Sequence, residues 1–243
     1  MSDACFTYYI HNICTHGDRP PGQGGDAGIA PERLPAIRQR LDELRPQLIV
    51  FCESNGDFAQ ETADALGYVR IPSPRTGISE LQILFDPAVF SVQQSFCHDP
   101  QPGRSAYMWA RLTHKATGRQ LLTIAYHGSL TTELRMGELH TMAQIAHEQG
   151  VPTLYMGDFN FRPNSEEYAL ITKENQDAAH AAPNGDPGYT WHGWPLWGND
   201  TYDYCFFDAG FRAVSHEILP QLYHEVILSD HCAVYGTMEI LPR

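Results

Sequence analysis

Short apolar runs alternate with amphipathic stretches along this chain. The β-branched and aromatic run at 5–13 and the apolar run at 47–53 are typical of strands. Between them, apolar residues at positions 34, 37, 41 and 44 repeat with the period of a helix, which we expect over 32–44. The Gly- and Pro-rich stretch at 16–31 is too long for a plain turn, so it predicts a functional or mobile loop after the first strand.

The rest of the pattern predicts more strands than helices. Helices are expected at 58–66, 131–148 and 165–173, and the segment 174–200 is expected to form a loop. Strands are expected at 68–71, 81–85, 89–96, 106–113, 120–126, 151–160, 203–207 and 232–240. Neighbouring hairpin-like strands punctuated by helices are typical of an α/β (α+β) fold in which two mixed sheets pack together with helices outside. No repeat or linker divides the chain, so we expect one domain over residues 1–243.

Composition narrows the class of protein. The chain has 243 residues, of which 42% are hydrophobic and 19% charged, and these values exclude a disordered protein. Its longest apolar run is five residues, whereas a membrane helix needs about 20. The first residues lack the pattern of a secretory signal, so we expect a cytoplasmic protein. The six cysteines contain no CxxC pair, so we expect reduced thiols and no structural zinc site.

The charge balance limits the partners. Asp and Glu number 29 against 16 Lys and Arg, which gives a net charge of −13 without any basic stripe. A protein that coats nucleic acid needs such a stripe, so stable nonspecific binding is excluded. An enzyme that grips one phosphate through a metal ion is still compatible, because the ion supplies the positive charge locally. Some of the excess carboxylates would then be metal ligands.

The sequence Gly157-Asp158-Phe159-Asn160 follows a predicted strand. Side chains two residues apart share one face of a strand, so Asp158 and Asn160 are expected to point the same way and Phe159 into the core. A carboxylate beside an amide oxygen suits a divalent metal or a phosphate-bound water. The structural alternative is an Asx turn that closes the strand.

Four other strand ends carry a residue that can bind a metal ion or transfer a proton. Glu53 follows the second strand, His127 ends a middle strand, Asp203 begins a late strand, and Ser229-Asp230-His231 precedes the last strand. Each has a structural alternative when taken alone, such as surface punctuation for Glu53 or a capped strand start for 229–231. A serine triad is excluded because no GxSxG turn is present. Since five strand ends carry a residue able to bind metal or move a proton, we expect one shared site at one edge of the sheets.

In this order, these pieces resemble the endonuclease/exonuclease/phosphatase superfamily, which is built on the DNase I fold. That signature has Asn-Ile after the first strand, an acid after the second, a histidine after a middle strand, GDxN, a DY strand, and SDH before the last strand. The chain supplies, in the same order, Asn12-Ile13, Glu53, His127, Gly157-Asp158-Phe159-Asn160, Asp203-Tyr204 and Ser229-Asp230-His231. The resemblance covers nearly the whole chain, and the family fold, a four-layer α/β/β/α sandwich, agrees with the predicted elements.

The resemblance implies a metal site. Glu53 would be the main ligand of Mg²⁺ or Mn²⁺, with Asn12 beside it, and Asp230 would support the metal or a neighbouring imidazole. It also implies that Asp158 orients or activates the attacking water, with Asn160 holding the phosphate or the metal alongside.

The resemblance further implies catalytic histidines. His231 would contact the scissile phosphate and assist proton transfer, with Asp203 bracing it, and His127 would bind a phosphoryl oxygen. The implied reaction is in-line attack of water on phosphorus, with the metal stabilising the developing charge.

Four positions lie outside the strict signature. His11 stands where the family often has an aromatic residue, and Cys52 stands where many members have Gln; both are expected to alter metal affinity or the shape of the site. Arg104, in a Gly-Arg-Ser loop, is a candidate phosphate contact, with a solvated arginine as the alternative. Trp191, in the aromatic segment 189–197, is a candidate for substrate stacking, or else covers a core edge.

The sequence therefore predicts a divalent-metal-dependent phosphodiesterase, with a nuclease as the leading hypothesis. The first alternative is a phosphatase or phospholipase C-like enzyme acting on inositol phosphates or lipid head groups. The second alternative is a non-catalytic binding protein with a decayed site. The expected partner is a phosphoester substrate, with nucleic acid bound only transiently, and neither a membrane span nor an obligatory protein partner is expected.

Overall fold

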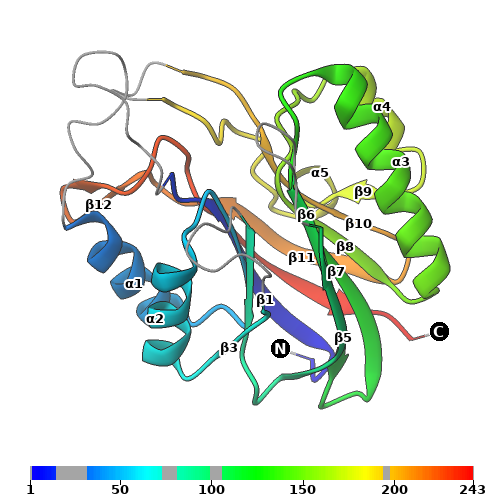
Figure 1. Ribbon diagram of the computed structural model, residues 1–243, viewed down its shortest axis with the longest axis horizontal. Coiled ribbons are helices and arrows are strands. Elements are labelled where there is room, and N and C mark those ends of the chain that lie inside the picture. Colours follow the sequence, from blue (N-terminus) through cyan, green and yellow to red (C-terminus); the bar gives the residue numbers. More distant parts are fainter. Residues whose placement is uncertain (1, 15–31, 73–80, 99–105, 194–197, 243) are drawn as a thin grey trace.

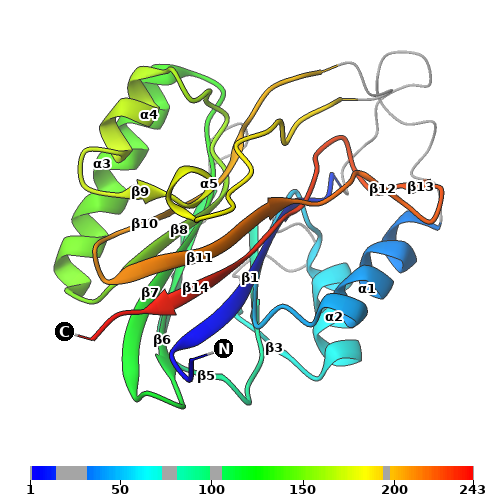
Figure 2. The same ribbon diagram turned by 180° about the vertical axis from the view of Figure 1, so that it is seen from behind.

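Two β-sheets lie face to face in the computed structural model of the chain, and helices cover the outer face of each sheet (Figures 1 and 2). The structure describes residues 2–14, 32–72, 81–98, 106–193 and 198–242. The loop predicted over 16–31 lies outside the described residues. The predicted fold class, two mixed sheets flanked by helices, is confirmed.

The first sheet contains six strands in the order β11-β14-β1-β2-β4-β3. Their bounds are β1 (Cys5–Asn12), β2 (Leu48–Cys52), β3 (Val69–Arg70), β4 (Leu81–Phe85), β11 (Phe211–Ile218) and β14 (Val234–Ile240). The neighbours β1 and β2 are parallel and the other pairs antiparallel. The helix α1 (Arg33–Leu44) lies between the two parallel strands in sequence, as such a crossover requires.

The second sheet repeats this plan in the order β5-β6-β7-β8-β10-β9. Its strands are β5 (Phe90–Cys97), β6 (Ala106–His114), β7 (Arg119–His127), β8 (Thr153–Asp158), β9 (Gln176–Asp177) and β10 (Asp203–Phe207). Here β7 and β8 are the parallel pair, and the long helix α3 (Thr132–Gln149) connects them. Each sheet therefore carries one parallel pair whose strands end at the same edge.

The remaining elements are short or peripheral. They are α2 (Gly56–Leu66), α4 (Glu166–Ile171), α5 (Ala178–Ala181) and the hairpin of β12 (Leu222–Tyr223) and β13 (Val226–Ile227). Local sequence sets the ends of α2: the side chain of Asn55 accepts a hydrogen bond from the backbone of Phe58, and Gly67 ends the helix with a φ of 73°.

Three apolar clusters fill the spaces between the layers. One lies between the two sheets, one between the first sheet and the helices α1 and α2, and one between the second sheet and α3 and α4. On β1, Phe6, Tyr8 and Ile10 enter the cluster between the sheets, whereas Tyr9 faces the helices. Alternate side chains of one strand therefore belong to two different apolar clusters, one on each face of the sheet.

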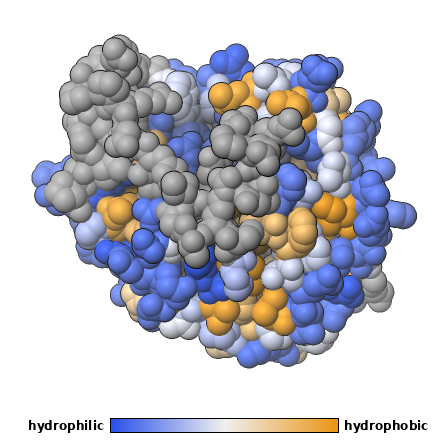
Figure 3. Space-filling model, in the orientation of Figure 1, coloured by the Kyte–Doolittle hydropathy of each residue, from blue (hydrophilic) through white to orange (hydrophobic). Residues whose placement is uncertain are grey.

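Hydrophilic residues surround scattered hydrophobic ones on the face seen in Figure 3. Within the described ranges, no helix has both the length and the apolar character that crossing a membrane requires.

Two expectations for the C-terminal half were wrong. The strand β11 was not predicted, because its sequence, FRAVSHEI, does not alternate apolar and polar residues along its length, and a register shift interrupts it between Ala213 and Ser215. The segment 174–200, expected to be loop, contains the short elements β9 and α5. Two- and four-residue elements are too short to show a periodicity, so tertiary contacts decide them.

Candidate active site

The polar strand ends singled out in the sequence meet at one edge of the sheets. Asp158, the last residue of β8, is the register partner of His127 on β7 and of Asp203 on β10. On the facing sheet, Asn12 is the last residue of β1, and Glu53 directly follows β2. The topology therefore brings together side chains that lie far apart in the sequence.

Side chains alternate between the two faces of a strand, and those of Asn12 and Asp158 lie on the faces between the sheets. On β1, Ile10 belongs to the inter-sheet core, and Asn12 lies two residues further along the same face. On β8, Met156 belongs to the same core, and Asp158 follows it in the same way. The site is thus the polar continuation of the core between the two sheets.

Asn12 joins two acidic groups across the sheets. Its fully buried side-chain nitrogen Nδ2 donates to Oε1 of Glu53 at 3.0 Å and to Oδ2 of Asp158 at 2.9 Å. Its oxygen Oδ1 accepts from the backbone N–H of Cys14 at 3.1 Å. In this arrangement Asn12 holds the two carboxylates in place through its nitrogen.

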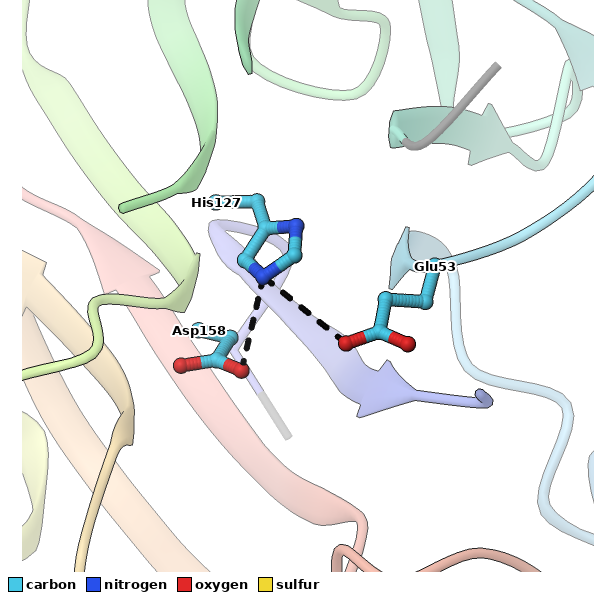
Figure 4. Close-up of side chains that lie close together, drawn as sticks. All are labelled: Glu53, His127 and Asp158. Carbon is cyan, nitrogen blue, oxygen red and sulfur yellow. Dashed lines mark ion pairs between the residues drawn. The ribbon is translucent and has the colours of Figure 1, made fainter. Parts of the chain in front are cut away.

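A group of three side chains has the donor atoms of a divalent cation site (Figure 4). The ring nitrogen Nε2 of His127 lies 3.9 Å from Oε1 of Glu53 and 3.8 Å from Oδ2 of Asp158. These distances are too long for hydrogen bonds, but they suit two ligands on one ion, because each ligand atom lies about 2.1–2.2 Å from the ion. Two carboxylate oxygens and an imidazole nitrogen therefore have the chemistry of a divalent cation site.

His231 and Asp203 form a buried pair on the other side of Asp158. Nδ1 of His231 lies 2.7 Å from Oδ2 of Asp203, and its Nε2 lies 3.7 Å from Oδ2 of Asp158. The three residues form a second group of close ligand atoms. Asp158 therefore belongs to both groups and stands at the centre of the site.

The proton of this pair resides on the imidazole. Burial by itself lowers the pKa of His231, but the carboxylates of Asp203 and Asp158 outweigh it and raise the pKa to about 10. Burial raises the pKa of Asp203 to about 6, against the opposing effect of the His231 charge. Because the imidazole holds its proton more tightly than the carboxyl, the pair is an imidazolium beside a carboxylate near neutral pH.

The GDxN segment forms a tight turn at the strand end. Oδ1 of Asp158 accepts the backbone N–H of Asn160 at 3.0 Å, which is the Asx turn considered as the structural alternative. Asn160 adopts a φ of 53°, and its side-chain nitrogen donates to the carbonyl of Gly128 at 2.9 Å. The turn and the site coexist, because Oδ1 closes the turn while Oδ2 of Asp158 faces Asn12 and the histidines.

The glycine of this segment is required sterically. Gly157 has a φ of 145°, and a Cβ at this position would lie 2.0 Å from the carbonyl oxygen of Tyr126. Any side chain there would push β8 away from β7 at the residue that precedes Asp158.

Asp230 lies beside the two groups rather than within them. Its carboxylate is half-buried and has Oγ of Ser229 at 3.3 Å, and its charge contributes to the raised pKa of His231. Its backbone carbonyl accepts from the N–H groups of His192 and Gly193 at 3.0 and 3.1 Å. Asp230 belongs to neither group of close ligand atoms, so its role beside the metal or the imidazole stays a prediction.

Trp191 reaches the site through its backbone. It forms isolated bridges with both Asp200 and His231. Its half-buried ring packs against Tyr202, with 6.0 Å between ring centroids, and leaves no space for a Cβ at Gly198. Stacking of this ring on a substrate stays a prediction, and Arg104 lies outside the described residues.

Three buried side chains support the site without having been assigned a role. Nε2 of His11 lies 3.3 Å from the carbonyl oxygen of His231, and Oγ1 of Thr190 accepts the backbone N–H of Asp203 at 3.0 Å. Arg33 donates to the carbonyls of Ile13, Cys14 and Leu228, at the ends of the segments that carry Asn12 and Asp230. In the sequence, only His11 carried a signal, as a departure from the family pattern.

Comparison with known proteins identifies the family. The sequence profile of the Endonuclease/Exonuclease/phosphatase family matches residues 23–231, which include every predicted catalytic and metal-binding residue except Asn12. The chain belongs to the endonuclease/exonuclease/phosphatase family. The family comprises phosphoester hydrolases, and the resemblance drawn from the sequence is confirmed. No curated protein matches the chain significantly in sequence.

Solved structures share the family fold. An endonuclease/exonuclease/phosphatase from Bacteroides vulgatus superposes with a TM-score of 0.82 at 20% identity, covering 98% of this chain and 99% of that one. The human Nocturnin catalytic domain with bound sulfate gives 0.76 at 18% identity, covering 98% and 94%. A mannosyl-6-phosphatase from Bacteroides thetaiotaomicron gives 0.76 at 16%, covering 98% and 100%. At these identities the likeness concerns the fold.

Proposed function

We propose that this chain is a divalent-metal-dependent phosphodiesterase that cleaves nucleic acid by in-line attack of water on phosphorus. The observation that carries this proposal is the position of Asp158. Its Oδ2 lies 3.8 Å from Nε2 of His127, which shares the candidate cation site with Glu53. The same oxygen lies 3.7 Å from Nε2 of His231, which is paired with Asp203. One carboxylate thus connects a site for positive charge with a site for proton transfer.

Glu53, Asp158 and His127 would hold the ion, and here His127 acts as the third donor rather than as the phosphoryl contact that the resemblance implies. A divalent ion at this place supplies the positive charge that stabilises the phosphate oxygens as negative charge develops in the transition state. Asn12 fixes the separation of the two carboxylates through its side-chain nitrogen. The geometry of the donors is therefore set before any ion binds.

The proposed proton chemistry belongs to Asp158 and His231. The carboxylate of Asp158 orients a water and accepts its proton as the water attacks. The P–O bond opposite the water breaks as the water oxygen bonds to phosphorus, and the imidazolium of His231 gives its Nε2 proton to the leaving oxygen. Asp158 then passes the proton of the water to Nε2, and Asp203 restores the charge of the ring and fixes its orientation. Asn160, whose side-chain nitrogen donates to the carbonyl of Gly128, would hold the phosphate or the metal alongside.

Charge favours a diester over a monoester. Glu53, Asp158, Asp203 and Asp230 bring four carboxyl groups to this edge. A phosphomonoester carries up to two negative charges near neutral pH, whereas a diester carries one, so repulsion is smaller for the diester. The net charge of −13 further favours brief contact with nucleic acid over stable binding.

Two chromogenic esters test the proposal. Bis(p-nitrophenyl) phosphate and p-nitrophenyl phosphate are assayed with Mg²⁺, Mn²⁺ or EDTA, followed by single-stranded DNA and RNA oligonucleotides. We expect metal-dependent cleavage of the diester and of an oligonucleotide, and loss of both in Asp158→Ala. The control is Asp64→Ala, which removes an exposed carboxylate from the last turn of α2.

Each outcome has a clear meaning. Preference for the monoester would replace the proposal with a phosphatase. Cleavage of the chromogenic diester without cleavage of either oligonucleotide would keep the chemistry and remove nucleic acid as the substrate. Equal activity of Asp158→Ala and Asp64→Ala would show that the described site is not the catalytic one.

A further inference from the structure

Cys52 contacts the backbone of Asp158, the residue at the centre of the site. It is the last residue of β2, it is the register partner of Asn12, and its side chain is fully buried. Its sulfur accepts the backbone N–H of Asp158 at 3.3 Å and lies 3.6 Å from the carbonyl oxygen of Tyr126. A thiol can accept one hydrogen bond and donate another, so both contacts are satisfied together.

The two contacts of the sulfur assign its hydrogen. A carbonyl oxygen can only accept, so the S–H group donates to Tyr126 on β7, while the sulfur accepts from Asp158 on β8. Cys52 thereby links the end of one sheet to two strands of the other.

Asn12 and Cys52 hold Asp158 at two points. Asn12 donates to the carboxylate oxygen Oδ2, and Cys52 accepts from the backbone nitrogen of the same residue. Both contacts cross from the first sheet to the second. A carboxylate held at its side-chain end alone can still shift with its strand, whereas the second contact fixes the backbone from which the side chain extends.

We propose that Cys52 is a positioning residue that sets the place of the catalytic Asp158 by accepting its backbone N–H. This inference rests on the proposed function, in which Asp158 orients the attacking water. The register of β7 and β8, with the N–H of Gly128 on the carbonyl of Asp158, gives the N–H of Asp158 the carbonyl of Tyr126 as its other acceptor. Removing the sulfur therefore takes away the acceptor from the first sheet and leaves a gap between the sheets, into which the strand end shifts. A displacement of about 1 Å at a reacting group lowers the rate by up to about 100-fold.

Three variants separate positioning from general core damage. Cys52→Ala removes the acceptor, and Cys52→Ser restores a group that accepts and donates. The matched control is Cys205→Ala, because Cys205 is also fully buried in the inter-sheet core, on β10. The readouts are kcat and KM for the diester and, by NMR, the hydrogen-exchange rate of the Asp158 amide.

We expect Cys52→Ala to lose about 10- to 100-fold in kcat with KM within about 2-fold, because water orientation and not substrate binding is affected. Cys52→Ser is expected to recover kcat to within about 3-fold of the wild type, since its hydroxyl keeps both contacts. Cys205→Ala is expected to keep wild-type kcat. The Asp158 amide is expected to exchange faster in Cys52→Ala only.

The inference is overturned if Cys52→Ala keeps wild-type kcat, if Cys205→Ala loses as much, or if serine fails to restore the rate. If the wild type cleaves no phosphoester, the proposed function fails, and amide exchange then decides the inference alone. Unchanged exchange at Asp158 in Cys52→Ala would reject the positioning role, and faster exchange reversed by serine would support it.

Discussion

Nδ1 of His231 lies 2.7 Å from Oδ2 of Asp203, and both side chains are buried. A carboxylate oxygen can only accept here, so Nδ1 carries the hydrogen. The other ring nitrogen, Nε2, is directed toward Asp158 at 3.7 Å. This pair therefore fixes the charge and the direction of the imidazole before a substrate arrives.

Replacing Asp203 with Asn is expected to lower kcat by about 10²- to 10⁴-fold, because the ring loses the group that holds its charge and tautomer. The pH profile of kcat should also change. The pKa of His231 is raised to about 10, so the protonated ring is present below that pH and is lost as the pH rises through it. Without the Asp203 charge, the alkaline limb should move to lower pH.

The control for this variant is another buried carboxylate of the second sheet. Asp177 accepts a hydrogen bond from Tyr168 and lies outside the described site. Asp177→Asn is expected to leave the alkaline limb where it is in the wild type. An unshifted limb in Asp203→Asn would contradict the role given to the pair.

Metal binding should stabilise the fold. An ion bound to the folded state alone, at 100 times its dissociation constant, adds about 2.7 kcal/mol. For a chain of this length, that is a rise in Tm of roughly 5–10 °C, which differential scanning fluorimetry with Mn²⁺ and with EDTA can measure. Glu53→Gln should lose most of this rise, whereas Glu148→Gln, an exposed acid on α3, should keep it. Equal rises in both variants would place the ion elsewhere.

Strand ends are local properties, so the sequence could predict that Glu53, His127 and Asp158 meet at one edge, whereas their roles stay predictions. Asn12 was assigned to the site only through the family resemblance. The contacts of Thr190 and Arg33 depend on loops and a helix that approach from distant parts of the chain, and no local period encodes them. The strand β11 was missed because its sequence, FRAVSHEI, does not alternate apolar and polar residues, and a register shift interrupts the strand between Ala213 and Ser215.

Phe159 anchors the site to the core beneath it. Its buried ring makes edge-to-face contacts with Tyr126 and Phe206 at 5.1 Å between centroids, within the cluster under α3. Phe159→Ala should lower the free energy of unfolding by about 3–5 kcal/mol, because it leaves a cavity among aromatic rings. Denaturant unfolding should show a change of about 1 kcal/mol or less for Phe96→Ala, whose ring is 49% exposed. A small loss for Phe159→Ala would mean that the cluster collapses around the gap.

A second buried histidine lies away from the site. Nδ1 of His216 on β11 lies 2.8 Å from the hydroxyl of Tyr8 on β1, and only 3% of the residue is exposed. Burial lowers the pKa of His216 to about 4, with Asp186 acting to raise it and His180 to lower it. The folded protein therefore keeps this ring neutral at a pH where the unfolded chain protonates it.

This difference predicts a pH-dependent loss of stability. The unfolded chain binds the extra proton below its pKa of about 6.5, so stability falls as the pH drops from there toward 4, by about 3 kcal/mol in all, and is unaffected by this group above pH 7. His216→Asn, which keeps an acceptor for Tyr8, should unfold with a flatter dependence over this range in urea titrations. His147→Asn, at an exposed position of α3, should retain the full slope. An identical slope in the wild type and His216→Asn would assign the acid sensitivity to other groups.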